Sequence, residues 1–237
     1  MTKVNIFKTL INILRDEQLR TDMEFRPINA SKTVQSALAD TGLIFKGMGM
    51  YSVVVVHYAY PNRVFKVSTS RWDGFRVYAK YCMERQGTPL IPTIYSANEK
   101  GNFAWYEMDM YHPCTERDLT HGGIVKYRTD KIGDTVNVLK AAAESFGDPD
   151  YQLKNNTHTY GMRKAKREEY LQGIKDNLQI AKRIYNAFKE THRLDVHRGN
   201  LMVNDDGEVI ITDPFANDLR TEIPVLEADP TDEEIVC

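Results

Sequence analysis

Three polar side chains near the end of the chain have types and spacing that could support phosphoryl transfer. Asp195 and Asn200 lie five positions apart in LDVHRGNLMV, and Asp213 follows the short apolar run VIIT. Phosphoryl transfer depends mostly on positioning and charge neutralisation, so it needs an aspartate to accept a hydroxyl proton, and an asparagine and a second aspartate to hold Mg²⁺. These residues are therefore candidates for catalysis rather than only parts of a solvated loop.

An earlier loop and a nearby lysine could bind the phosphates of a nucleotide. In GMGMYS, Gly47, Gly49 and Ser52 form a G-x-G-x-x-S pattern between two expected strands. Glycine lets backbone N–H groups approach a polyphosphate without an intervening Cβ, and a strand-loop-strand context is typical of kinase-like ATP binding. Lys66 lies fourteen residues after Ser52, in RVFKV, where its alternating apolar neighbours make it the polar residue of a strand.

The order of these parts is more informative than any one of them. A glycine turn without a ligand and an exposed strand lysine are both common. The chain, however, combines a glycine loop, a strand lysine, D-x-x-x-x-N and a strand-terminal aspartate, which together meet the needs of ATP-dependent phosphoryl transfer. The combination therefore indicates a nucleotide-dependent phosphotransferase.

The elements that must position these residues can be predicted from periodicity. The β-branched and aromatic residues 43–67 indicate strand, glycine loop, strand, turn and strand, and two further strands are expected over residues 92–96 and 103–108. Between the first three strands and these two, residues 73–86 have an apolar face at helical spacing, and the expected helix ends at Gly87. Together these elements predict a small β-rich lobe with one helix.

The second half of the chain predicts a mainly helical lobe. Apolar residues recur at steps of three and four over residues 165–192, which is typical of a long amphipathic helix. A hairpin through residues 204–207 and a strand over residues 209–212 follow it. The fold class is therefore α+β with two lobes, and a chain of this kind makes a cleft.

The ends and an internal segment complete the expected organisation. Phe7, Leu10, Ile11 and Leu14 fall at helical spacing, and the last seventeen residues contain six acids and no Lys or Arg, which favours a mobile acidic tail. The expected segments are a helical extension over residues 1–40, the first lobe over 41–108, the second lobe over 109–220 with a polar insertion over 113–161, and the tail over 221–237.

Composition limits the classes of partner. The 31 basic and 33 acidic side chains nearly cancel, so we expect no direct nucleic-acid binding and no attraction to a membrane surface. The three cysteines form no C-x-x-C pair, and no apolar run could span a bilayer or serve as a signal peptide. A cytoplasmic location is therefore expected.

Several motifs together resemble a known family. LDVHRGNLMVNDDGEVIITDP resembles the catalytic and metal-binding loops of the protein-kinase-like superfamily. GMGMYSVVVVHYAYPNRVFKV, QGTPLIPTIY and DVHRGN with ITDP look like the early serine/threonine protein kinases of autographivirus (T-seven-like) bacteriophages, over about residues 42–214 without the insertion. The resemblance implies a minimal two-lobed protein-kinase-like fold, and phosphorylation of host proteins with ATP and Mg²⁺ in the host cell cytoplasm during infection.

The same resemblance implies roles for individual residues. Asp195 would orient or deprotonate the substrate hydroxyl, and Asn200 and Asp213 would bind magnesium. Lys66 would contact the α- and β-phosphates of ATP, and the two glycines and the serine of the G-x-G-x-x-S loop would cover the phosphates.

Two further residues are expected near this site. His197 stands two residues after Asp195, where it could donate to the γ-phosphate. Glu84 lies on the helix after Lys66 and is the candidate for the ion pair that holds that lysine, although it falls near the helix end and Asp73 lies at the helix start. Asp213 is followed by Pro-Phe, so the usual glycine of the magnesium loop is missing.

Two alternative functions remain open. D-x-H-x-x-N and the short segment after Asp213 also occur in small-molecule kinases of the aminoglycoside-phosphotransferase type, although the chain is short for their helical substrate lobe. The second alternative is a catalytically inactive kinase-like module that binds a host protein, which the uncertain partner of Lys66 and the presence of Pro214 would permit.

Overall fold

The computed structural model describes residues 1–113, 172, 176, 179–195, 198–206, 208–218 and 229–236. They fall into two compact units. The first contains Met1–Gln86, Thr93–Met110 and Thr221–Cys237, and the second contains Gly87–Pro92 and Tyr111–Arg220. The polar insertion predicted over residues 113–161 lies, apart from Pro113, outside the described residues. Residues 165–171, 173–175 and 177–178 of the helix predicted over residues 165–192 also lie outside them.

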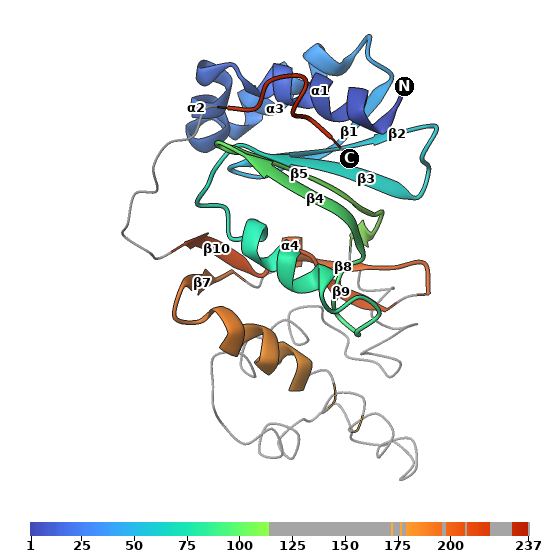
Figure 1. Ribbon diagram of the computed structural model, residues 1–237, viewed down its shortest axis with the longest axis vertical. Helices are drawn as coiled ribbons and strands as arrows, with labels where there is room; N and C mark the ends of the chain where they lie inside the picture. Colours follow the sequence, from blue (N-terminus) through green and yellow to red (C-terminus); the bar gives the residue numbers. More distant parts are fainter. Residues whose placement is uncertain are drawn as a thin grey trace. The chain divides into compact units, whose positions relative to one another are not determined.

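A five-stranded antiparallel sheet forms the centre of the first unit (Figure 1). Its spatial order is β1-β2-β3-β5-β4. The strands are β1 (Leu43–Met48), β2 (Ser52–His57), β3 (Arg63–Ser68), β4 (Ile94–Lys100) and β5 (Phe103–Asp109). The predicted strands are confirmed, and the described residues have a mixed α and β fold.

Three helices cover one face of this sheet (Figure 1). They are α1 (Lys3–Leu14), α2 (Glu17–Phe25) and α3 (Pro27–Leu38). The side chain of Thr2 caps α1, that of Asp16 caps α2, and Pro27 occupies the first turn of α3, where a missing N–H costs nothing. Phe7, Leu10 and the other predicted apolar residues of α1 are buried against the sheet, so the helical prediction for this segment is confirmed.

One helix, α4 (Phe75–Met83), lies on the opposite face of the sheet (Figure 1). The Asp73 carboxylate accepts a hydrogen bond from the Phe75 amide at 3.0 Å, which satisfies one of the free N–H groups at the helix start. Phe75 packs edge-on against Tyr106 of β5, with ring centroids 4.9 Å apart. The sheet is therefore enclosed between two helical layers.

Residues 229–236 correct the prediction of a mobile tail over residues 221–237, whereas residues 221–228 and 237 lie outside the described residues. Residues 229–236 pack on the first unit, where Ile235 is only 1% exposed and belongs to the core formed by α1–α3 and the sheet. The indole Nε1 of Trp105 donates to the Val236 carbonyl at 2.6 Å, and Arg15 forms an ion pair with Asp232 at 3.3 Å. Acidic composition favours mobility, but the buried side chain of Ile235 and the ion pair with Arg15, directly after α1, fix this segment.

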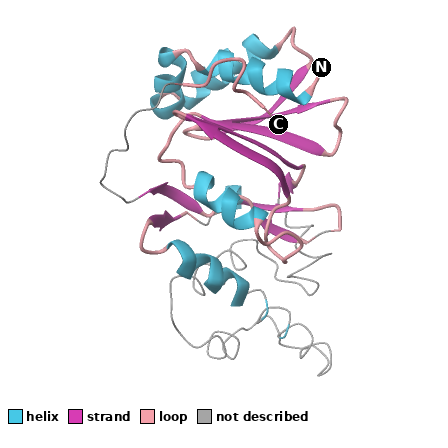
Figure 2. Cartoon of the chain, viewed as in Figure 1, coloured by secondary structure: helices cyan, strands magenta, loops and turns pink. Residues whose placement is uncertain are grey.

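The second unit contains short strands and one described helical stretch (Figure 2). Residues 179–188 are helical. The remaining elements are β6 (His112–Pro113), β7 (His192–Leu194), the 3-10 turn Arg198–Asn200, β8 (Leu201–Val203), β9 (Val209–Ile211) and β10 (Phe215–Asp218). β8 and β9 form the predicted hairpin with β6 beside β8, and β7 pairs with β10.

In the part of the chain that the structure describes, every helix is too short or too polar to cross a membrane.

Candidate active site

Two loops of the second unit are joined by backbone hydrogen bonds. Asp195 directly follows β7, and its amide donates to the carbonyl of Pro214 at 2.7 Å. The Thr212 amide donates to the Asn200 carbonyl at 2.9 Å, and the Thr212 hydroxyl donates to the same oxygen at 3.2 Å. The D-x-x-x-x-N loop and the loop that contains Asp213 therefore lie side by side.

The side chain of Asn200 also holds the loop from within. Its Nδ2 donates to the backbone carbonyl of Asp195 at 2.7 Å and lies 3.4 Å from the Asp195 carboxylate. Because the amide nitrogen makes both contacts, the amide oxygen is the atom that could bind a cation. The Asp195 side chain is exposed and can be reached by a substrate, whereas one carboxylate oxygen of Asp213 is buried.

Apolar side chains beneath the loops fix them to the unit. Leu201 and Val203 of β8 are buried and pair with Ile211 and Val209 of β9. The Ile211 amide donates to the Leu90 carbonyl at 2.8 Å, which connects the hairpin to Gly87–Pro92 of the same unit. Leu201 and Val203 therefore fix the end of the loop to the interior of the second unit.

These groups have the chemistry that Mg²⁺ requires. Magnesium prefers oxygen ligands and is usually held by one or two carboxylates together with substrate phosphates. The Asn200 amide and the Asp213 carboxylate fit that description. Among the described residues, three or more His, Cys, Asp or Glu side chains nowhere gather into a group that could hold a metal by themselves, so a bound ion would need phosphate or water ligands as well.

The residues expected to contact phosphates lie on one face of the first unit's sheet. Gly47 of β1 pairs with Val54 of β2, Val54 pairs with Lys66 of β3, and Lys66 pairs with Tyr106 of β5. Directly paired residues of antiparallel strands share a face. Ser52, two residues before Val54, shares it too, so the glycine loop and the lysine are on the same side as α4.

The glycine loop itself is a tight turn between β1 and β2. The Gly49 amide donates to the Ser52 carbonyl at 2.8 Å. A Cβ at Gly49 would stand 3.4 Å from the Ser52 hydroxyl, at the limit of normal contact, whereas one at Gly47 would meet open space. A side chain at position 49 would therefore crowd the Ser52 hydroxyl, whereas the open space at Gly47 leaves room for a ligand.

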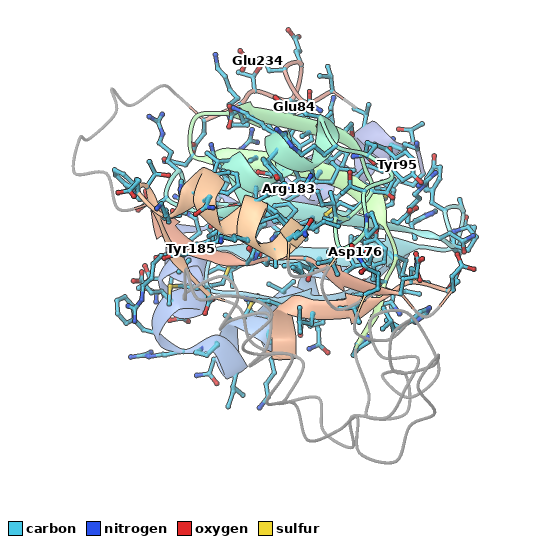
Figure 3. All side chains as sticks on the ribbon, turned by 90° about the horizontal axis from the view of Figure 1, so that it is seen from below. Glu84, Tyr95, Asp176, Arg183, Tyr185 and Glu234 are labelled. Carbon is cyan, nitrogen blue, oxygen red and sulfur yellow. The ribbon has the colours of Figure 1, made fainter. Side chains whose placement is uncertain are left out.

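Lys66 is held by an aromatic ring, and the expected ion pair with Glu84 is not formed. Lys66 is 6% exposed, and its Nζ lies 3.6 Å from the centroid of the Phe75 ring. Glu84, labelled in Figure 3, follows the last turn of α4. Its side chain is 71% exposed, and its Oε2 pairs with Arg85 at 2.8 Å. Glu84 stands nine positions after Phe75, which is about 13.5 Å along the helix axis at about 1.5 Å per residue.

The expected residues thus fall into two groups. Gly47, Gly49, Ser52 and Lys66 share one face of the first unit. In the second unit, the loops that carry Asp195, Asn200 and Asp213 are bonded together. His197 lies outside the described residues. The sequence predicts that Phe75 lies in the helix over residues 73–86, but it does not predict the contact with Lys66. The only signal in the sequence is that an aromatic residue follows the strand lysine by nine positions.

Comparison with known proteins identifies one family. A family model described as "Bacteriophage T7 protein kinase 0.7" matches residues 3–235 of the chain. Among curated proteins, no significant match was found.

Proposed function

Because the chain belongs to the bacteriophage T7 protein kinase 0.7 family, we propose that it is an ATP- and Mg²⁺-dependent serine/threonine protein kinase that phosphorylates host proteins in the host cell cytoplasm. The observation that carries the proposal is the bonded pair of loops in the second unit. The amide of Asp195 and the carbonyl of Pro214 join them at one point, and Thr212 and Asn200 join them at another.

Asp195 is the proposed base in this site. Its exposed carboxylate can accept the proton of a serine or threonine hydroxyl, and the bonds from Asn200 restrain the loop that carries it. A base held in position in this way contributes about a hundredfold to ten-thousandfold to the rate. The remaining acceleration must come from charge neutralisation around the phosphates.

Asn200 and Asp213 are the proposed ligands of Mg²⁺. The ion, when bound with ATP, neutralises charge on the phosphates during transfer. Asn200 contributes its amide oxygen while its nitrogen stays bonded to the Asp195 carbonyl, so one side chain links the ion site to the base. Lys66 adds a positive charge for the α- and β-phosphates, and the backbone at Gly47 and Gly49 covers them.

Transfer of labelled phosphate from ATP tests the proposal. The wild-type chain with Mg²⁺ should label protein in a host lysate, and Asp195→Asn and Asp213→Asn should each lower the rate by about a hundredfold or more. Asp206→Asn is a matched control, because Asp206 is an exposed aspartate in the turn between β8 and β9. Equal labelling by the wild type and both site variants would refute the assignment.

A small-molecule kinase is the second candidate, favoured by the D-x-H-x-x-N pattern. Incubation with labelled ATP and a panel of hydroxylated metabolites, in parallel with the lysate, separates the two. Labelled metabolite without labelled protein would support the second candidate. Magnesium-dependent ATP binding without transfer to any acceptor would instead support a kinase-like binding module.

A further inference from the structure

The contact between Lys66 and Phe75 points to a positioning residue. The Lys66 ammonium lies 3.6 Å from the centroid of the Phe75 ring, well inside the distance at which a ring face attracts a cation. We propose that Phe75 positions Lys66 for contact with the phosphates of ATP through this cation–π interaction. The inference rests on the proposed function, because it assigns Lys66 to the nucleotide.

The Phe75 ring is itself held firmly. It is fully buried, and its plane is nearly perpendicular to that of Tyr106, at 88° with centroids 4.9 Å apart. Tyr78, one turn along α4, contacts it from another side at 6.3 Å. Edge-to-face packing of this kind restricts how a ring can turn. The ring can therefore act as a fixed platform for the ammonium.

The start of α4 is anchored to the sheet beside this platform. Asp73 accepts the amide hydrogen of Phe75, and Arg76 donates to the carbonyl of Asn102 in the turn between β4 and β5. Arg76 also pairs with Glu99 of β4 at 3.5 Å, and Lys80 on the next turn pairs with the same carboxylate. Displacement of Phe75 would require these contacts to break as well.

The ring holds the ammonium without reducing its charge. It has no net charge and attracts the ammonium through its quadrupole. Phe75 is the first residue of α4, so the ammonium also lies near the positive end of the helix dipole. Neither the ring nor the helix dipole therefore reduces the positive charge that Lys66 would offer to the phosphates.

Fluorinated phenylalanines at position 75 test the inference, because fluorine weakens the quadrupole of the ring with little change of shape. We expect the affinity for ATP to fall stepwise from phenylalanine through monofluoro- to trifluorophenylalanine, by about tenfold overall, while the Tm stays constant. The same series at Phe103, a fully buried phenylalanine in the core on the α1–α3 side of the sheet, is the matched control and should leave ATP affinity unchanged.

Spectroscopy of the nucleotide-free protein provides a second readout. With ¹³C-labelled lysine, the ε-protons of Lys66 should be shifted upfield by the Phe75 ring current. Phe75→Leu should remove that shift, and Phe75→Tyr should keep it. Loss of the shifted signal in Lys66→Arg assigns it to Lys66.

The outcomes separate the two levels of the proposal. The role of Phe75 would be overturned if the wild type were active but fluorination at position 75 left the ATP affinity unchanged. It would also be overturned if the Lys66 ε-protons had ordinary chemical shifts. Either result would leave the kinase assignment intact. A wild type that neither binds ATP nor transfers phosphate would overturn the proposed function and the inference with it. Stepwise loss of affinity together with the upfield shift supports the inference.

Discussion

The two units hold their candidate site residues in different ways. In the first unit, Lys66 is buried between a sheet and α4, and its position depends on side-chain packing around the Phe75 ring. In the second unit, Asp195 is exposed and its loop is held by backbone hydrogen bonds to Pro214 and by the side chain of Asn200. Damage to packing should therefore reduce stability in the first unit, whereas damage to hydrogen bonds should reduce activity in the second.

The largest effect is expected from the core of the first unit. Ile235→Ala removes a side chain buried in that core and should lower the free energy of unfolding by about 2–5 kcal/mol. Val236→Ala is the matched control, since Val236 is 50% exposed and its contact with Trp105 uses only the backbone carbonyl. Urea unfolding measures both. Equal stability of the two variants would show that the C-terminal segment is not part of the cooperative core.

The opposite pattern is expected at Asn200. Asn200→Ala removes the bond to the Asp195 carbonyl and a proposed magnesium ligand, so phosphate transfer should fall about a hundredfold, which corresponds to about 2.7 kcal/mol. The Tm should change little, because the side-chain contact is at the surface. Asn204→Ala removes comparable bonds to Glu208 in the nearby hairpin and should leave transfer unchanged. A large loss of Tm in Asn200→Ala would contradict the expectation that damage to hydrogen bonds in the second unit reduces activity rather than stability.

A smaller effect should appear at alkaline pH. Burial raises the pKa of Cys82 on α4 from 9.0 to about 12. Above pH 9 the unfolded thiol loses its proton while the folded thiol keeps it, so stability contributed by Cys82 is present below pH 9 and is lost as pH rises toward 12, by about 1.4 kcal/mol per pH unit. Unfolding titrations between pH 8 and 10.5 should show a steeper decline for the wild type than for Cys82→Ser. Parallel curves would contradict this.

The smallest effect concerns the exposed end of the C-terminal segment. Hydrogen bonds from the Thr231 amide and hydroxyl lower the pKa of Glu234 below its usual 4.5. The folded pKa is depressed, so the contribution to docking is present above pH 4.5 and is lost as pH falls through the folded value. Trp105 fluorescence should report weaker docking in acid, and Glu234→Gln should reduce that pH dependence. An identical acid transition in the variant would exclude Glu234 as the cause.

The contrast between the units also explains what could be predicted from the sequence. The D-x-x-x-x-N loop, the strand of Lys66 and the hairpin before Asp213 depend on local patterns, namely alternation, turn residues and fixed spacing. These features were predicted correctly because each is encoded within a short stretch. The hydrogen bonds that join the loops of Asp195 and Asp213 are seen only in the structure.

Long-range packing could not be predicted in the same way. Glu84 was chosen as the partner of Lys66 because opposite charges attract, but α4 places Glu84 at the far end from Lys66 and beside Arg85. Phe75 carries no charge, and only the tertiary structure places its ring against the ammonium. The docked C-terminal segment was missed because one Ile235 among acidic residues does not reveal a partner about 130 positions earlier.

The docked C-terminal segment also constrains how the protein is made. The first unit draws its core from residues near both ends of the chain, and Trp105 and Val236 are separated by 131 positions. At about 5–20 residues per second, the ribosome needs about 7–26 seconds to make that interval. During that time the emerging sheet and α1 lack Ile235 and expose the surface it later covers. Assembly of the first unit is therefore completed only after the second unit has been synthesised.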